Sequence, residues 1–264
     1  MDVSRRLENR VAIVTGAGQG VGEGIARRLA AEGARLVIAA RRAKTGEPVA
    51  QAIRDGGGEA VCIVTDVADT ASVHSCVDET VERFGRLDIM VHNAFTGGRP
   101  HRLEDADLAI HWQDMSRTAV WASLVCARAA FTHLVAASAR PVGEGAGRLI
   151  LVTSPSGVEG SANIPLYSAA KAAQRAIAKS LAREWGPHAV TVNCLGPVAG
   201  SPALIQAFER NPALQSAIEA RTPLGRVGDI TSDIGSVALF LASDDASFVT
   251  GQTVICDGGS FLGL

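Results

Sequence analysis

The chain alternates short, uninterrupted apolar runs with longer amphipathic stretches, and few folds accommodate that order. We expect strands at seven runs rich in β-branched residues, 11–15, 35–40, 60–64, 87–92, 148–153, 189–195 and 253–256. Apolar runs without polar alternation are typical of strands that are covered on both faces of a sheet. Because helical segments separate them, right-handed crossovers would make the strands parallel. The sequence therefore predicts the α/β class, with a doubly wound, seven-stranded parallel sheet and helices on both faces.

Two of the helical stretches show where their helices end. The pattern "GIARRLAAEGA" stops at Gly33, and "SVHSCVDETVERFG" stops at Gly85. Glycine adopts the left-handed conformation of a helix C-cap without steric cost. The segment "RPVGEGAG", residues 140–147, is interpreted as a surface loop, and the composition changes abruptly nowhere along the chain. We therefore expect residues 1–264 to form a single domain.

Composition and charge argue against several classes of protein. Hydrophobic residues make up 47% of the 264 residues, which is enough for a large core without metals or disulfides. The net charge of −2 predicts no general attraction to nucleic acid or to anionic membranes. The five cysteines form no CxxC pair and the six histidines show no ligand spacing, so we expect reduced thiols and no metal.

Neither a signal peptide nor a membrane span is expected. The N-terminal segment leads into only four apolar residues, 11–14, and no uncharged apolar run reaches about 18 residues. We therefore expect a soluble, cytoplasmic protein.

A glycine-rich loop, "TGAGQGVG" at 15–22, connects the first expected strand with the first helix. Gly16, Gly20 and Gly22 allow the backbone to turn sharply and to approach a ligand where a Cβ atom would collide. The helix N-terminus directs unpaired N–H groups and the positive end of its dipole at the same space, which suits a pyrophosphate. A tight turn without a ligand remains the alternative for the glycines alone. Their place between strand and helix favours a dinucleotide and a sheet of the Rossmann type.

The end of the second strand bears on which dinucleotide is preferred. An acidic residue there would bind the adenosine ribose of NAD, whereas an arginine would favour the 2′-phosphate of NADP. Here Ala40 stands where the acid is expected, and Arg41 and Arg42 follow. Two solvated surface arginines are the alternative. We expect NADP(H) to be preferred, with NAD(H) possible.

A tyrosine and a lysine suggest acid–base chemistry. Tyr167 is the only tyrosine, and Lys171 follows four residues later in "YSAAK". On a helix the two side chains share one face. A nearby cation favours the phenolate, so we expect Lys171 and the positive charge of a bound nicotinamide together to lower the pKa of Tyr167 from its usual value near 10. A packed tyrosine with an exposed lysine is the alternative for the pair alone.

Taken together, these motifs resemble those of the short-chain dehydrogenase/reductase family over nearly the whole chain. "TGAGQGVG" is similar to the family's TGxxxGxG loop, and "YSAAK" is similar to its YxxxK motif, with Ser154 at the family's usual spacing before Tyr167. "TDV" (65–67) resembles the segment beside the adenine, and "VNCLGP" (192–197) the stretch beside the nicotinamide. "TPLGRVGD" (222–229) and "TGQTVICDGG" (250–259) resemble C-terminal segments of the ketoacyl-reductase-like members.

The resemblance implies an NAD(P)(H)-dependent oxidoreductase that interconverts a carbonyl and a secondary alcohol. Tyr167 would be the general acid/base, Ser154 would position the substrate oxygen, and Lys171 would also hold the nicotinamide ribose. The residues expected to bind the cofactor are Gly16, Gln19, Gly20, Val21, Gly22, Arg41, Arg42, Asp66, Val67, Asn93, Ala94, Tyr167, Lys171, Pro197, Val198 and Ser201.

The sequence departs from the family pattern at three places. Phe95 replaces the glycine of the family's "NNAG", and we expect it to narrow the floor of the cofactor cleft. The asparagine that holds a water near the lysine in relatives corresponds to Ala119, or to Ser116 if the alignment shifts. The family's "PG" reads "PV" at Pro197 and Val198. The proton relay is therefore expected to be rerouted or weakened.

These departures support a second hypothesis, a non-catalytic dinucleotide-binding sensor or scaffold. The presence of Ser154, Tyr167 and Lys171 favours the enzyme. A third hypothesis, nucleic-acid binding through Arg99, His101 and Arg102, is disfavoured because no aromatic stacking platform accompanies them.

The resemblance also implies a helical substrate lid at about 199–221. Its Leu204, Ile205, Phe208 and Leu214 either contact an apolar or amphipathic substrate or form the inner face of an ordinary helix. The alanine-rich segment 168–185 permits the close approach of a partner helix, and we expect a homotetramer.

Overall fold

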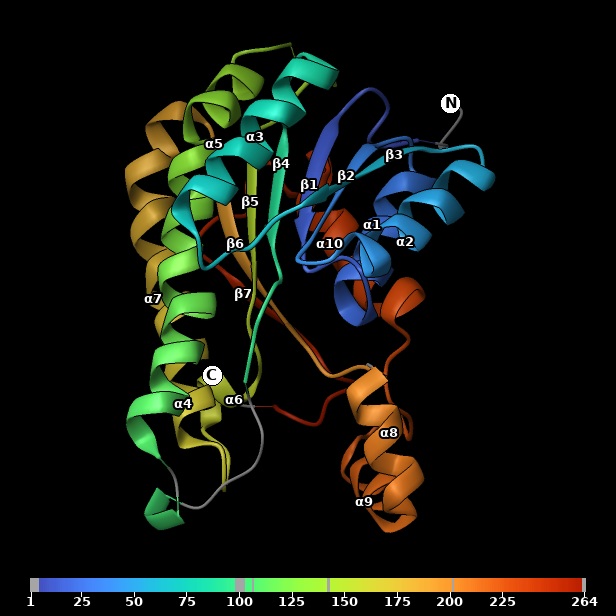
Figure 1. The fold of residues 1–264 in the computed structure, drawn as a ribbon, viewed down its shortest axis with the longest axis vertical. Helices are drawn as coiled ribbons and strands as arrows, with labels where there is room; N and C mark the ends of the chain where they lie inside the picture. The colour runs from blue at the N-terminus through green and yellow to red at the C-terminus, as the bar shows by residue number, and fades with distance from the viewer. Residues whose placement is uncertain (1–4, 98–102, 106, 142, 201, 263–264) are drawn as a thin grey trace.

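Seven parallel strands form one sheet in the order β3-β2-β1-β4-β5-β6-β7, as Figure 1 shows. The computed structural model describes residues 5–97, 103–105, 107–141, 143–200 and 202–262. The strands are β1 (Val11–Thr15), β2 (Arg35–Ala40), β3 (Glu59–Val64), β4 (Ile89–His92), β5 (Arg148–Val152), β6 (Thr191–Pro197) and β7 (Thr253–Cys256). The predicted doubly wound parallel sheet is confirmed, and each strand begins and ends close to its expected bounds.

Helices cover both faces of the sheet because successive strand residues point to opposite sides. Ile13 packs in the layer formed with α3 (Thr70–Phe84), α5 (Ala122–Ser138) and α7 (Pro165–Trp185). Its neighbour Val14 packs in the other layer, formed with α1 (Gly20–Ala31), α2 (Ala43–Asp55) and α10 (Gly235–Ala242). Burying one such side chain stabilises the fold by about 1.5–3 kcal/mol. The strands lack alternating polar residues because both faces of the sheet are covered by apolar helical layers.

Shorter helical elements complete the fold. They are η1 (Leu103–Asp105), α4 (Leu108–Met115), the π-helix η2 (Ser116–Trp121), α6 (Ser156–Glu159), η3 (Gly186–His188), α8 (Pro202–Arg210), α9 (Pro212–Arg221), the π-helix η4 (Ile230–Ile234) and η5 (Asp244–Ala246). The stretch Leu108–Ser138 is long and apolar enough to cross a membrane, but half of its most apolar window is buried inside the molecule. That burial is typical of a core helix.

The expected glycine positions terminate their helices. Gly85 is the C-cap of α3 with φ 75°, and Gly33, with φ 91°, follows the C-cap of α1. Both residues adopt the left-handed conformation that glycine accepts at no steric cost.

The expected helical segment at 199–221 consists of two helices. Helix α8 ends at Arg210, and Pro212 begins α9, since proline suits the first turn of a helix and not its interior. Helix α9 has no buried residue among those described. Figure 1 shows α8 and α9 beyond the same end of the sheet as α4 and α6.

Candidate active site

The carboxyl ends of four neighbouring strands bring the predicted site residues to one edge of the sheet. Gly16 follows β1, Asn93 follows β4, Ser154 lies just beyond β5, and Pro197 ends β6. Since β1, β4, β5 and β6 are adjacent and parallel, these residues share one edge. Crevices that bind ligands form at this edge in open α/β sheets.

Hydrogen bonds join the ends of β1 and β4. The Thr15 hydroxyl oxygen accepts from the backbone N–H groups of Asn93 and Ala94 at 3.0 and 3.1 Å. The Asn93 side-chain amide donates to the carbonyl oxygens of Thr15 and Gly16 at 3.0 and 3.3 Å. The side chain of Asn93 therefore supports the glycine loop from beneath.

Two positions in this loop require glycine. Gly16 has a φ of +67°, and a Cβ at this residue would lie 2.8 Å from the Ala94 Cα. At Gly22 a Cβ would lie 2.4 Å from the Asn93 side-chain nitrogen and 2.7 Å from the Gly16 carbonyl oxygen. Gly22 is thus needed for packing against Asn93, whereas Gly16 is needed for the turn.

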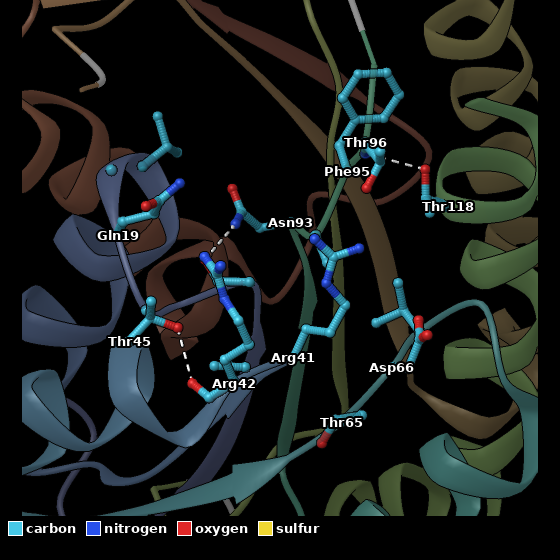
Figure 2. Close-up of a pocket in the computed structure, with 17 residues that line it drawn as sticks. Gln19, Arg41, Arg42, Thr45, Thr65, Asp66, Asn93, Phe95, Thr96 and Thr118 are labelled. Carbon is cyan, nitrogen blue, oxygen red and sulfur yellow. Dashed lines mark hydrogen bonds between the residues drawn. The ribbon is translucent and has the colours of Figure 1, made fainter. Parts of the chain in front are cut away.

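The loop borders a cavity of about 400 Å³, drawn in Figure 2. The cavity is lined by Gly16, Gly18, Gln19, Gly20, Val21, Ala40, Arg41, Arg42, Thr45, Thr65, Asp66, Val67, Asn93, Ala94, Phe95, Thr96 and Thr118. Gln19, with extended backbone, precedes the N-terminus of α1, whose N–H groups attract a phosphate. The predicted residues from the glycine loop, the end of β2, the "TDV" segment and the end of β4 come together here.

Sequence reasoning missed several residues of the cavity wall, namely Gly18, Thr45, Thr65, Thr96 and Thr118. The position of Thr45 in the first turn of α2 was the available signal, because a hydroxyl there faces the same edge as Arg42. Thr118 belongs to none of the motifs found in the sequence, so only the fold brings it to the cavity.

Arg41 and Arg42 form a positively charged rim on this cavity (Figure 2). Arg42 is the N-cap residue of α2, and its carbonyl oxygen accepts from the Thr45 hydroxyl at 2.8 Å. Within the described part of the chain, neither guanidinium forms an ion pair with a carboxylate. Two such cations beside a helix N-terminus are suited to a phosphate group. The glycine cradle and this rim fit the adenosine and pyrophosphate half of a dinucleotide.

Tyr167 and Lys171 lie on one face of α7, as their spacing predicts. The Lys171 ammonium nitrogen, Nζ, is 5.8 Å from the centre of the Tyr167 ring. The lysine side chain is buried, with 4% exposure, so the alternative of an exposed lysine is wrong. Its Nζ donates to the carbonyl oxygen of Val152 at 2.8 Å and to the Gln174 side-chain oxygen at 3.0 Å. The Ser154 hydroxyl lies 2.8 Å from that of Ser156.

Burial dominates the pKa values of both groups. Burial raises the pKa of the Tyr167 phenol above 10, and a hydrogen bond with Ser154 opposes the rise. Burial also lowers the pKa of the Lys171 ammonium to about 7. Among the protein's own groups, the cost of burying a phenolate exceeds the stabilisation that its neighbours provide. The expected lowering, which includes the charge of a bound nicotinamide, stays a prediction.

Phe95 separates these two residues from the cavity. Its ring packs edge-on against Tyr167, with centres 5.3 Å apart, and the Lys171 Nζ lies 4.7 Å from the ring centre. Figure 2 shows Phe95 and Thr96 at the opposite end of the cavity from Thr65. Phe95, the aromatic residue in place of the family's glycine, thus lines the end of the cavity that lies next to Tyr167 and Lys171.

Several predicted residues do not line the cavity. These are Gly22, Ser154, Tyr167, Lys171, Pro197 and Val198. Ser201, Arg99, His101 and Arg102 lie outside the described residues. Gly22 supports Asn93 from behind, and the others lie on the far side of Phe95 or on the adjacent strands.

The two positions considered for the family asparagine both fall in the π-helix η2. Ala119 is fully buried, and its carbonyl oxygen accepts from the Ser123 hydroxyl at 2.6 Å. The Ser116 hydroxyl donates to the Gln113 carbonyl oxygen at 3.2 Å. The side chain that contacts Lys171 is instead Gln174, which sequence reasoning missed. A polar amide three residues after Lys171, on the same face of the helix, was the available signal.

Known proteins are similar to this chain over almost its whole length. The family model described as enoyl-(acyl carrier protein) reductase matches residues 16–260. Tropinone reductase-like 3 of Erythroxylum coca is 32% identical over 263 residues, covering 98% of this chain and 95% of the relative.

Two solved structures are similar in fold. A gluconate 5-dehydrogenase from Burkholderia cenocepacia in complex with NADP and tartrate has a TM-score of 0.87 at 32% identity, covering 97% of this chain and 96% of that one. A 7α-hydroxysteroid dehydrogenase complexed with NADH and 7-oxo glycochenodeoxycholic acid has a TM-score of 0.87 at 27% identity, covering 96% and 95%. The chain therefore belongs to the short-chain dehydrogenase/reductase family and is a dinucleotide-dependent oxidoreductase.

Proposed function

We propose that this protein interconverts a carbonyl compound and a secondary alcohol with NADP(H), using Tyr167 as general acid/base. The observation that carries the proposal is the grouping of Tyr167, Ser154 and Lys171 at one sheet edge, one aromatic ring away from the dinucleotide cavity. A nicotinamide bound at this edge would supply the hydride. The arginine rim supports NADP(H), and the solved relatives named above hold either NADP or NADH.

The residues divide the remaining work between them. Tyr167 gives its phenolic proton to the substrate oxygen in reduction and takes it back in oxidation. Ser154 hydrogen-bonds the same oxygen and so stabilises the charge that develops on it. Lys171 places a positive charge beside the phenol and favours its ionised form once the proton has left. Because Phe95 lies over Lys171 and Tyr167, its ring would have to move aside for a nicotinamide to reach them.

The substrate class is an apolar or amphipathic carbonyl compound or alcohol. Helix α8 presents Ile205 with 47% exposure, and Leu204 and Phe208 are half-buried. Helices α8 and α9 lie at the substrate edge of the sheet, where a lid over the cleft would place these side chains against the substrate (Figure 1). The five free cysteines support a reducing, cytoplasmic location. The assembly is proposed to be a homotetramer.

Tyr167→Phe tests this function, because it removes the phenolic proton and keeps the ring that packs on Phe95. Turnover should fall by at least about a hundredfold, since general acid catalysis contributes about 10²–10⁴ in rate. NADPH affinity, measured by fluorescence, should stay within a factor of about two. Lys171→Ala should weaken both turnover and binding. The assay uses small diketones, cyclic ketones, ketoacyl thioesters and steroids.

A non-catalytic sensor is the second candidate, and one observation favours it. Phe95 shields Tyr167 and Lys171 from the cavity, so a bound nucleotide could leave them untouched. If the wild type binds NADPH but reduces none of these substrates, the sensor is the better assignment. Retention of most of the wild-type rate by Tyr167→Phe would show that Tyr167 is not the acid.

A further inference from the structure

Lys171 carries its ammonium group in a buried position with two polar acceptors. The Nζ donates to the Val152 carbonyl oxygen at 2.8 Å and to the Gln174 Oε1 at 3.0 Å. The Phe95 ring covers it with its centre 4.7 Å away. The titratable groups that face it are Tyr167 on its own helix, His92 on β4 and Cys194 on β6. Within the described part of the chain, no carboxylate faces the Lys171 ammonium. Its charge is therefore stabilised by neutral dipoles, the Val152 carbonyl and the Gln174 amide.

The orientation of the Gln174 amide follows from donor and acceptor chemistry. Gln174 is 1% exposed, and a lysine ammonium has no acceptor, so the amide oxygen must face Lys171. The amide nitrogen then donates to the Ser123 hydroxyl oxygen at 3.0 Å. The Ser123 hydroxyl in turn donates to the Ala119 carbonyl oxygen at 2.6 Å. Each donor in this series of hydrogen bonds has an acceptor. The reverse orientation of the Gln174 amide would point its N–H groups at the Lys171 ammonium.

The series of hydrogen bonds from Lys171 through Gln174 and Ser123 ends in the π-helix η2. In an α-helix each carbonyl accepts from a backbone N–H group four residues on, whereas a π-turn disturbs that pairing and often occurs at functional sites. In η2 the carbonyl oxygen of Thr118 contacts the His92 ring at 3.1 Å, and that of Ala119 accepts from Ser123. Ser123 is fully buried, so its geometry is held by packing on every side.

We propose that Gln174 is the positioning residue of Lys171, and that Ser123 holds the Gln174 amide in the orientation that keeps its oxygen on Nζ. In this arrangement Gln174 does the work that an asparagine at the position of Ala119 does through a water in relatives. Gln174 favours the ammonium form of Lys171 against its burial, and it holds Nζ in place next to the Phe95 ring. It touches neither substrate nor reacting atoms.

The sequence allows a direct measurement of the Lys171 charge. The chain contains only three lysines, Lys44, Lys171 and Lys179, so lysine labelled with ¹³C at Cε gives three NMR signals. Lys44→Arg and Lys179→Arg assign them. Lys171 is identified as the signal that titrates near pH 7, because burial lowers its pKa to about 7. This titration requires neither cofactor nor substrate.

Gln174→Met keeps the length of the side chain and removes the acceptor. The pKa of Lys171 should fall by about one unit or more, because a hydrogen bond to a charged group is worth about 1.5–3 kcal/mol and one unit corresponds to about 1.4. Ser123→Ala should lower it by a smaller amount, and Gln174→Glu should raise it above the wild-type value. Gln51→Met, on the exposed face of α2, is the matched control and should change nothing.

An unchanged Lys171 pKa in folded Gln174→Met overturns the proposal. Should that variant fail to fold, Gln174→Glu decides, since the absence of a rise would mean that position 174 does not contact Nζ. A kinetic measurement adds a second test. Unlike the NMR titration, it depends on the proposed function. The alkaline limb of the kcat profile should move to lower pH in Gln174→Met and to higher pH in Gln174→Glu. If no substrate is turned over, the proposed function fails while the NMR result stands.

Discussion

At the scale of single residues, the hydrogen bonds of His92 fix its tautomer, and burial keeps the ring neutral. The Thr15 hydroxyl oxygen already accepts from two backbone N–H groups, so its proton goes to the His92 Nδ1 at 3.1 Å. The other ring nitrogen, Nε2, therefore carries the proton and donates to the Thr118 carbonyl oxygen at 3.1 Å. Burial, and then the charge of Lys171, lower the pKa of His92 to about 4. The imidazole links β1, β4 and the π-helix in one tautomer.

This histidine should make the protein sensitive to mild acid. Between pH 6.5 and 4 the unfolded chain binds a proton at His92 that the folded chain does not, so the free energy of unfolding falls as the pH falls. The loss reaches about 3 kcal/mol near pH 4 and does not grow below it. Urea unfolding at steps of pH measures it. His92→Gln should flatten this part of the profile, and an equally steep profile in the variant would contradict the assignment.

At the scale of elements, the junction of β2 and α2 supports the proposed preference for NADP(H). It places Arg41 and Arg42 on the cavity rim at the positive end of the α2 dipole. NADPH should therefore bind more tightly than NADH. Arg41→Ala and Arg42→Ala should each weaken NADPH binding by about ten- to a hundredfold and NADH binding far less, because a charge-assisted hydrogen bond to phosphate is lost.

Lys44→Ala is the matched control for that experiment. Lys44 carries the same charge in the first turn of α2 but is exposed and does not line the cavity. Fluorescence titration of both nucleotides should show little change for it. Tighter binding of NADH than of NADPH by the wild type would contradict the predicted preference. Equal losses in the arginine and lysine variants would assign the effect to the overall positive charge of this region instead of to the rim.

At the scale of the whole molecule, α5 and α7 lie side by side, and their outer surface is where the proposed assembly would form (Figure 1). Helix α7 exposes Ala169, Ala172 and Ala176 on one stripe, and α5 exposes Leu124 beside the Trp121 that precedes it. Small residues permit close approach of helices, and exposed large apolar residues mark an interface. This surface supports the proposed homotetramer with two-fold axes.

Light scattering should therefore give about four times the chain mass of 27.3 kDa. Ala176→Arg should shift the population to smaller species, because a long charged side chain prevents close packing of the helices. Ala31→Arg, at an exposed position on α1 in the opposite helical layer, should leave the mass unchanged. A wild-type protein with the mass of a single chain at micromolar concentration would reject the assembly.

Local patterns alone determined the sheet, the helix ends and the edge at which the site forms. These patterns are local: an apolar run, a glycine at a helix end, and the spacing from Tyr167 to Lys171 each span only a few residues. They can therefore be interpreted without knowing how the helices and strands pack together. The contacts between segments were decided only by the tertiary structure. The ring of Phe95 covers Lys171, Gln174 reaches across to Ser123, and burial raises the pKa of Tyr167. Such effects depend on which side chains exclude water from a group, and that is decided when elements far apart in the chain, such as the end of β4 and α7, pack together.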